Sequence, residues 1–171
     1  NAVSEGDVLI GLASSGVHSN GFSLIRSLPL DWDATLAPTS SGKESRTLRD
    51  ALLEPTLLYG PAILPLLEGV EVHGMAHITG GGMFENIPRM TKQPFRYEID
   101  KRSLPRFAVF EAISEAGVDD KEMFATFNMG IGFVLAVPPH EAERACAMIE
   151  SSGLHAIEIG RVGSGDEVCI E

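Results

Sequence analysis

The chain has 171 residues, 44% of them hydrophobic, and a formal net charge of −11 with a pI near 4.8. This length suits one hydrophobic core and is short for two, so we expect a single domain over residues 1–171. The acidic balance argues against nucleic acid as a partner, because a basic face supplies most of that affinity. The apolar stretches are too short and too interrupted by Gly and Pro to span a bilayer, so we expect a cytoplasmic protein without a membrane partner.

Apolar runs separated by turn residues predict helices that alternate with strands. We expect strands near residues 7–13, 72–78, 95–99, 130–137, 156–162 and 167–171. We expect helices near residues 21–28, 46–53, 56–68, 82–90, 107–117, 119–126 and 139–152. Pro61 and Pro65 predict a late start or a kink in the helix near 56–68, and residues 31–45 are predicted to form a mobile loop. This order predicts an α+β fold with helices packed on a mixed β-sheet.

One turn concentrates residues suited to binding an anion. A predicted strand is followed by Gly16-Val17-His18-Ser19-Asn20-Gly21 and then by an amphipathic stretch. Glycines between a strand and a helix leave backbone N–H groups free at the helix N-terminus, where phosphate binds. The alternative is an ordinary turn capped by Ser19 or Asn20.

A second turn repeats this arrangement, because the predicted strand near 72–78 runs into Thr79-Gly80-Gly81-Gly82. Consecutive glycines cost roughly 0.5–1 kcal/mol each relative to alanine in regular structure, so we interpret them as a close approach of backbone to a ligand. Two such turns suggest one shared cleft. A third segment, residues 126–132, precedes the strand near 130–137, and there a bulge or a tight approach between strands is the stronger interpretation.

The histidines and cysteines differ in what they suggest. His18 lies in a turn that we expect to be exposed, where an imidazole could donate to an oxyanion, move a proton near neutral pH, or merely cap the turn. His73 and His77 alternate on one face of a predicted strand, but no third ligand of matching spacing accompanies them, so we assign no metal site. Cys146 and Cys169 show no Cys-x-x-Cys spacing, so we expect buried thiols.

Five segments occur in an informative order, namely residues 6–24, 53–56, 76–82, 85–89 and 126–132. In this order the chain resembles the phosphoribosylformylglycinamidine cyclo-ligase family, whose members close the imidazole ring in purine biosynthesis. The His-Ser-Asn-Gly piece at 18–21 and the Glu-Asn-Ile-Pro-Arg piece at 85–89 separate this family from its relatives.

The resemblance covers only the second half of that enzyme, so it implies an N-terminal partner domain that is absent from this chain. It implies an ATP-dependent reaction in which the formyl amide oxygen of formylglycinamidine ribonucleotide is phosphorylated, an amidine nitrogen attacks, phosphate leaves and the ring closes. It also implies that ATP and Mg²⁺ are held mainly by the partner domain, that the full-length enzyme is a homodimer, and that the fragment alone is inactive.

The same resemblance gives the candidate site. It assigns His18 as the catalytic residue, acting as proton donor or electrostatic stabiliser. It assigns substrate and phosphate binding to Ser19, Asn20, Gly21, Thr79, Gly80, Gly81, Gly82 and Asn128, and it assigns no metal ligand to this chain. Family members usually have a basic residue where Leu57 stands and Val-Lys where Gly60-Pro61 stand, so phosphate contacts from those positions are not carried over.

Two other classes of function stay open. The same superfamily includes selenophosphate synthetase, thiamine-phosphate kinase and the formylglycinamide ribonucleotide amidotransferase, which have a related second domain. A non-catalytic module that binds a phosphorylated ligand or completes an oligomer would carry similar glycines. Activity of the full-length parent separates these classes, whereas ligand binding by the fragment does not.

Overall fold

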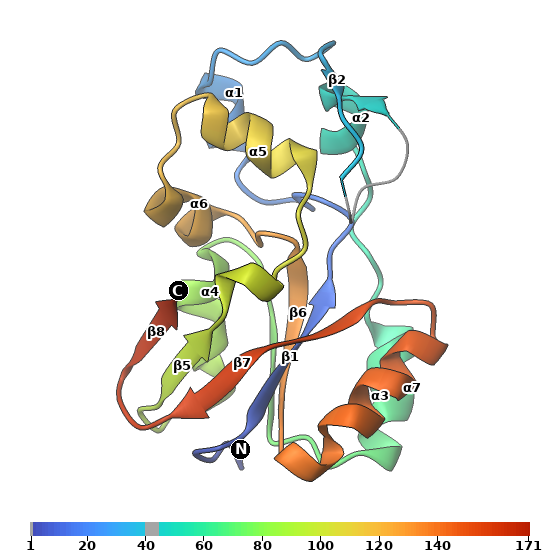
Figure 1. Cartoon of the computed structure of the whole chain (residues 1–171), viewed down its shortest axis with the longest axis vertical. Helices are drawn as coiled ribbons and strands as arrows, with labels where there is room; N and C mark the ends of the chain where they lie inside the picture. The colour runs from blue at the N-terminus through green and yellow to red at the C-terminus, as the bar shows by residue number, and fades with distance from the viewer. Residues whose placement is uncertain (1, 40–44) are drawn as a thin grey trace.

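The computed structural model describes residues 2–39 and 45–171 (Figure 1). The strands are β1 (Val8–Ala13), β2 (Thr35–Leu36), β3 (Arg46–Thr47), β4 (Gly74–His77), β5 (Arg96–Ile99), β6 (Ile131–Val137), β7 (Ala156–Gly163) and β8 (Glu167–Ile170). The α-helices are α1 (Phe22–Ser27), α2 (Leu48–Leu52), α3 (Gly60–Gly69), α4 (Gly82–Asn86), α5 (Ala108–Glu115), α6 (Asp120–Thr126) and α7 (Ala142–Ser151). Short 3₁₀ helices are η1 (Ile87–Met90), η2 (Lys101–Ser103) and η3 (Pro139–Glu141).

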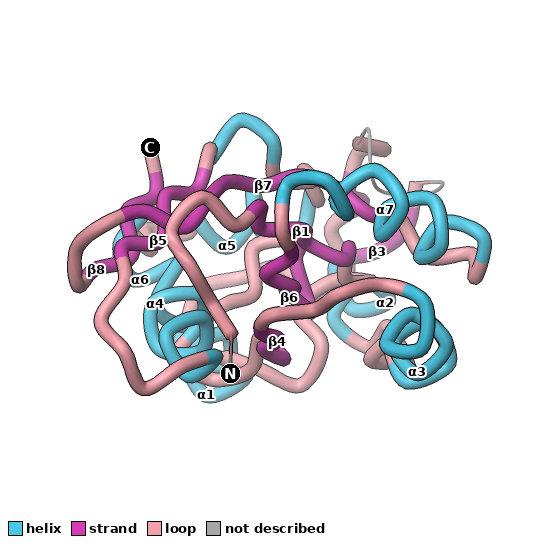
Figure 2. The backbone as a smooth tube through the Cα atoms, turned by 90° about the horizontal axis from the view of Figure 1, so that it is seen from below, coloured by secondary structure: helices cyan, strands magenta, loops and turns pink. Residues whose placement is uncertain are grey.

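The main sheet is mixed. Within the described residues it has six strands in the order β4-β6-β1-β7-β5-β8, and β2 pairs separately with β3. β5 and β8 run parallel, whereas the other neighbouring pairs of the main sheet are antiparallel. β4 and β8 are therefore its two edges, which the view in Figure 2 places at opposite ends. The predicted α+β class, with helices on a mixed sheet, is confirmed.

The two faces of the sheet pack against different helices, because successive side chains of a strand point to opposite sides. In β1, Val8 and Ile10 belong to an apolar cluster with α3 and α7, whereas Leu9 belongs to a cluster with α4 and α6. β6 alternates in the same way, with Leu135 on the first side and Val134 on the second. Each such side chain contributes roughly 1.5–3 kcal/mol when it is fully buried, so the central strands anchor the fold.

A third apolar cluster joins α1, α2, α5 and α6 into a helical lobe at one end of the sheet (Figure 1). Its fully buried members include Ile25, Leu48 and Phe127. Val17, which comes from the first glycine-bearing turn, belongs to the same cluster. This turn is therefore anchored at the junction between the sheet and the helical lobe.

The predicted elements are found, with corrections at their ends. The predicted helix 46–53 begins as β3, because Arg46 and Thr47 pair with β2. The predicted helix 82–90 changes to the 3₁₀ helix η1 at Ile87, where Pro88 lacks the N–H that a continuing α-helix would use. The expected late start of the helix near 56–68 is confirmed, since α3 begins at Gly60.

The predicted loop 31–45 is corrected in part. Residues 40–44 lie outside the described residues. Thr35 and Leu36 form β2, and the carbonyls of Trp32 and Ala34 accept hydrogen bonds from the N–H groups of Arg49 and Leu48, each over 2.9 Å. Residues 32–36 are thus held against β3 and the start of α2. The mobility of the loop 31–45 stays a prediction.

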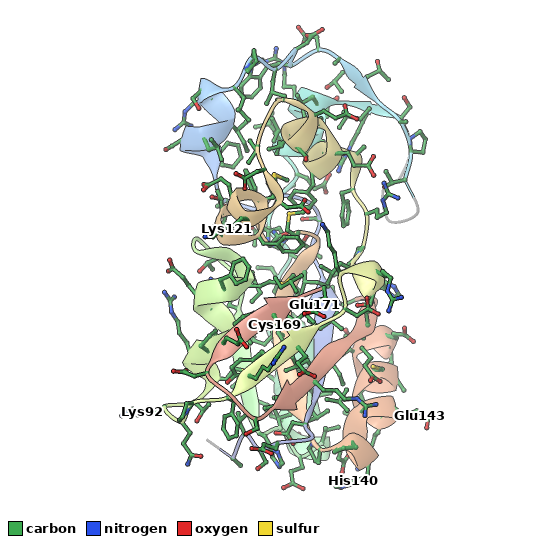
Figure 3. The ribbon with its side chains drawn as sticks, turned by 60° about the vertical axis from the view of Figure 1, so that its left-hand side comes forward. Lys92, Lys121, His140, Glu143, Cys169 and Glu171 are labelled. Carbon is green, nitrogen blue, oxygen red and sulfur yellow. The ribbon has the colours of Figure 1, made fainter. Side chains whose placement is uncertain are left out.

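Two expectations drawn from composition concern membranes and thiols. Within residues 2–39 and 45–171, no helix combines the length and apolar character needed to cross a bilayer. Cys146 on α7 and Cys169 on β8 are free, and both are partly exposed, which corrects our expectation of buried thiols. Cys169, labelled in Figure 3, lies on β8, an edge strand of the sheet.

His73 fastens the N-terminal segment to the sheet. Its Nδ1 lies 2.9 Å from both carboxylate oxygens of the buried Asp7, and its Nε2 lies 3.2 Å from Glu71 Oε1. The N–H of Ala2 also donates to the His73 carbonyl over 3.2 Å. Burial alone would lower the pKa of His73, but hydrogen bonds and negative charge from Asp7 and Glu71 outweigh burial and raise that pKa.

This raised pKa predicts a pH-dependent contribution to stability. The contribution is fully present below the unfolded-state pKa of about 6.5 and is lost as the pH rises through the higher folded-state value. His73→Gln should therefore lower the Tm more at about pH 6 than at about pH 9. The exposed His140 in η3 offers a control, since His140→Gln changes a surface side chain away from Asp7 and Glu71 and should cost little stability (Figure 3). Equal losses of Tm for His73→Gln would contradict the assignment.

Candidate functional site

The first turn connects β1 to α1 and holds His18 in an unusual conformation. His18 has a φ of 54°, in the left-handed region that residues other than Gly, Asn and Asp rarely adopt. We expected this turn to expose the imidazole, yet His18 is only 5% exposed. The expectation is wrong because Tyr59 and the start of β6 pack around the ring.

The two nitrogens of His18 have different surroundings. The N–H of Ser15 donates to Nε2 over 3.2 Å, so the proton of the neutral ring resides on Nδ1. Among the described residues, Nδ1 has no hydrogen-bond partner. Burial, with a smaller contribution from His77, lowers the pKa of His18 to about 4, so the ring is neutral near pH 7. A buried donor without an acceptor costs roughly 1–3 kcal/mol, which suggests that a ligand atom is the missing acceptor.

Gly132 brings the first and second turns together. It lies where the register between β1 and β6 shifts, and a Cβ at this position would lie 2.7 Å from His18 Cε1 and would overlap the Tyr59 hydroxyl. The Gly132 carbonyl accepts a hydrogen bond over 2.8 Å from the N–H of Ile78, which directly precedes Thr79. His18 and the turn at 79–82 are therefore neighbours across Gly132. Of the two structural interpretations of the third segment, the bulge is confirmed, because the register between β1 and β6 shifts at Gly132.

The side chain of Asn86 holds the turn at 79–82 through hydrogen bonds to the backbone and the Thr79 hydroxyl. Its Nδ2 donates to the carbonyls of Gly82, Gly80 and Thr79 over 2.7, 3.2 and 3.3 Å. Its Oδ1 accepts from the Thr79 hydroxyl over 3.2 Å and from Arg89 over 3.0 Å. Within the described residues, the N–H groups of Gly80 and Gly81 find no acceptor, so they are available to a ligand.

The three glycines of this turn differ in backbone conformation and in the space around them. Gly82 has a φ of 56°, and a Cβ there would overlap the carbonyl oxygen of Phe124 at the end of α6. Gly81 also has a positive φ, of 91°, whereas Gly80 is exposed and faces open space. Packing alone explains glycine at position 82. The positive φ of Gly81 and the Glu85 side chain, whose Oε2 would lie 2.5 Å from a Cβ at position 81, also account for glycine there. The expected approach of backbone to a ligand therefore narrows to Gly80, with the free N–H of Gly81 beside it.

Asn128 joins the first turn to the start of β6. Its side chain is fully buried, Nδ2 donates to the Gly16 carbonyl over 2.8 Å, and Oδ1 accepts from the Ser14 hydroxyl over 3.1 Å and from the N–H of Gly130 over 2.9 Å. This amide is occupied within the protein. Asn128 therefore supports the turns instead of reaching a ligand, which corrects its predicted place among the binding residues.

Ser19 and Asn20 remain accessible beside a segment that we did not assign to the site. Ser19 is exposed, with its hydroxyl 3.5 Å from Thr56 Oγ1, and Asn20 is partly exposed. The Ser15 hydroxyl donates to the Pro55 carbonyl over 2.7 Å. The sequence held one signal for this neighbour, because Pro55 and Thr56 belong to segment 53–56, one of the five segments that carry the family resemblance. Pro55 and Thr56 thus contact Ser15 and Ser19 of the first turn.

Other neighbours of the turns were also missed. The rings of Tyr59, His77 and Phe133 lie together beside His18, and Asn86 lies under the second turn. In sequence, the aromatic residues had the pattern of core positions. Cavities of about 300 and about 690 Å³ lie elsewhere, the first between η2, α5 and α6 and the second against β5, β7 and β8, and neither includes a residue of the two turns.

The described residues contain no group of three or more His, Cys, Asp or Glu side chains placed to hold a metal ion. His73 pairs with Asp7 and Glu71, whereas the His77 ring stacks on Phe133 with centroids 6.0 Å apart. The two imidazoles therefore have separate neighbours and separate roles.

Several curated proteins of similar sequence carry the name phosphoribosylformylglycinamidine cyclo-ligase. The chain is 46% identical over 167 residues to the phosphoribosylformylglycinamidine cyclo-ligase of Lysinibacillus sphaericus, covering 96% of this chain and 48% of that protein. It is 45% identical over 170 residues to the protein of the same name from Clostridium acetobutylicum, covering 99% and 49%. The chain thus spans about half the length of the curated relatives it matches.

Solved structures share the fold at much lower identity. The thiamine-monophosphate kinase of Stenotrophomonas maltophilia has a TM-score of 0.65 at 19% identity, covering 100% of this chain and 52% of that chain. The hydrogenase maturation protein HypE in complex with ATP has a TM-score of 0.61 at 18% identity, covering 95% and 44%. Residues 4–170 match the family described as AIR synthase related protein, C-terminal domain, and the chain belongs to that family.

Proposed function

We propose that this chain is the C-terminal half of an ATP-dependent phosphoribosylformylglycinamidine cyclo-ligase. That enzyme converts formylglycinamidine ribonucleotide to aminoimidazole ribonucleotide in purine biosynthesis and releases ADP and phosphate. The observation that carries the proposal is the identity of 46% and 45%, over 96% and 99% of the chain, to proteins of that name. Kinases and maturation proteins of the superfamily share the fold at 19% and 18% identity, which supports them less as a functional guide.

The chemistry requires donors that hold a phosphorylated intermediate. An amide oxygen leaves poorly, so ATP first converts it to a phosphate ester, and fixed donors then stabilise the charge that develops as phosphate departs. In this proposal the free N–H groups of Gly80 and Gly81 bind the phosphate, and Ser19 and Asn20 orient the substrate. Thr79, Gly21 and Gly82 keep the two turns in the conformation that presents these donors.

His18 would act as a neutral hydrogen-bond donor in this site. With a pKa of about 4, its ring is rarely protonated near pH 7, so proton transfer from an imidazolium contributes little. The Nδ1–H group instead suits an oxygen that gains negative charge as the ring closes. We therefore favour the electrostatic role over the acid role for His18.

ATP and Mg²⁺ would be bound mainly by a partner domain from the part of the relatives' length that this chain does not span. The partner domain would also cover the two turns. We further propose that the full-length enzyme is a cytoplasmic homodimer, which native mass spectrometry of the longer protein tests.

The division of labour predicts that residues 1–171 alone have no cyclo-ligase activity, because this sequence holds no nucleotide-and-magnesium motif. With formylglycinamidine ribonucleotide and ATP, the purified chain should release no ADP. The longer natural protein that contains this sequence should form aminoimidazole ribonucleotide, detected by chromatography. Substrate-dependent ADP release by the chain alone would contradict the division. A longer protein that phosphorylates thiamine phosphate or selenide instead would favour the superfamily alternatives, and ligand binding without any turnover would favour a binding module.

A further inference from the structure

A row of aromatic side chains next to His18 has no part in the function proposed above. His77 of β4 and Phe133 of β6 are opposite each other in the strand register, and their rings stack at 6.0 Å with planes 29° apart. The Tyr59 ring lies 5.5 Å from Phe133, 5.9 Å from His77 and 6.1 Å from His18, measured between centroids. Tyr59 therefore connects the stacked pair to His18.

The exposure of these rings increases from Tyr59 to His77. Tyr59 is 6% exposed, Phe133 is partly exposed and His77 is exposed. β4 is an edge of the sheet, so the outer side of the row at His77 is open to solvent, and Met75 on the same face is 46% exposed. Edge strands usually carry charged side chains outward, so an open aromatic row at an edge suggests a binding surface.

This row ends near the N–H groups of Gly80 and Gly81, to which the proposed function assigns the phosphate. His77 is two residues before Thr79, and Ile78 between them is hydrogen-bonded to Gly132, against which the His18 ring packs. The unpartnered Nδ1 of His18, in a residue that is 5% exposed, independently indicates a ligand at this place. One molecule with a phosphate and a flat ring would meet both features.

We propose that His77 and Phe133 form an aromatic wall that stacks on the planar nitrogen heterocycle of a 5′-ribonucleotide whose phosphate lies at Gly80 and Gly81. Tyr59 is a positioning residue for this wall, since its hydroxyl donates to the Ala13 carbonyl over 2.9 Å and fixes its ring between His18 and the stacked pair. Every base presents a π-face, so the wall accepts adenine or imidazole. The inference rests on the proposed phosphate site and adds the ring that the site recognises.

The test is an NMR titration of the 171-residue chain with four probes, namely inorganic phosphate, ribose 5-phosphate, AMP and 5-aminoimidazole-4-carboxamide ribonucleotide. The two ring-bearing nucleotides should shift the His77 ring protons through the ring current, and they should bind roughly tenfold more tightly than ribose 5-phosphate. The two nucleotides distinguish a preference for adenine from one for imidazole. Phosphate and ribose 5-phosphate should shift the amides of Gly80 and Gly81 and leave the His77 ring unmoved.

Two variants and a control make the result specific. Phe133→Leu keeps an apolar side chain without the ring, and His77→Ala removes the ring at an exposed position. Each should remove the tenfold preference for nucleotides, whereas His140→Ala in η3 should keep it. If ribose 5-phosphate binds as well as the nucleotides, or if no nucleotide moves the His77 resonances, the wall is wrong while the phosphate site stands. If nucleotides move His77 but not Gly80 and Gly81, the wall stands and the phosphate site fails.

Discussion

Gly82→Ala is expected to destabilise the fold by about 3–5 kcal/mol, the largest effect that we foresee for adding one methyl group. Gly82 has a φ of 56°, where a side chain is strained, and a Cβ would overlap the carbonyl oxygen of Phe124. This carbonyl oxygen belongs to the backbone, so it cannot move away from a new Cβ by a rotamer change as a side chain could. Either the start of α4 or the end of α6 must move, and both belong to the apolar cluster on one face of the sheet.

Gly80→Ala is the matched control, because it adds the same methyl group two residues earlier. Gly80 is exposed, and a Cβ there has nothing within 4 Å. Its free energy of unfolding should stay within about 0.5 kcal/mol of the wild type, as surface substitutions usually do. Urea denaturation of the three proteins measures both values. A loss of less than about 1 kcal/mol for Gly82→Ala would mean that α4 and α6 separate easily, contrary to the packing described above.

The sequence predicted the strands β1 and β6 well because both are apolar on both faces. β1 and β6 read as continuous apolar runs, and both are buried almost throughout. Ends of elements were predicted less well, since they depend on distant partners. Arg46 and Thr47 became a strand only because β2 pairs with them, and no local pattern announces that pairing.

The structure brings the two glycine-bearing turns together, as the sequence predicted, and their role as a binding site stays a prediction. These turns gave the place of the candidate site, yet the burial of His18 depends on Gly132 and Tyr59, which are far away in sequence. From the sequence, glycine at position 82 was interpreted as a close approach of backbone to a ligand. In the structure, the carbonyl oxygen of Phe124 on α6 leaves no room for a Cβ there, and this alone explains the glycine. Asn128 resembled a ligand-binding amide because a sequence cannot show that a side chain's hydrogen bonds are already made.

His18→Ala in the full-length cyclo-ligase proposed above is expected to lower kcat by roughly 10²–10³-fold, the usual effect of removing one donor to a developing oxyanion. The physical reason is the loss of Nδ1–H, a buried donor that has no acceptor among the described residues. His18→Asn is the matched variant, because asparagine tolerates a φ of 54° and places an amide donor near the former Nδ1. Steady-state kinetics should show that His18→Asn keeps much more activity than His18→Ala.

The pH dependence separates a neutral donor from an acid. With the pKa of His18 at about 4, the kcat profile of the wild type should show no step near pH 6.5 that His18→Asn removes. Stability should respond in the same region, because the unfolded chain protonates at about 6.5 while the folded chain resists protonation down to the lowered value. Acidification from about pH 6.5 should therefore cost the wild type more stability than His18→Asn. This direction is opposite to that expected for His73, so the two histidines can be told apart in one series of melting curves.

Kinetics and melting curves together decide between the catalytic and structural roles of His18. A structural cap would lose about 1 kcal/mol of stability on substitution and keep nearly normal turnover. The buried ring makes some loss of Tm certain for His18→Ala, since Nε2 no longer accepts from Ser15 and space opens beside Tyr59. The decisive quantity is therefore kcat at a temperature where the variant stays folded. Near-normal kcat for His18→Ala under that condition would show that the unpaired Nδ1–H group is a cost of packing the turn and serves no substrate.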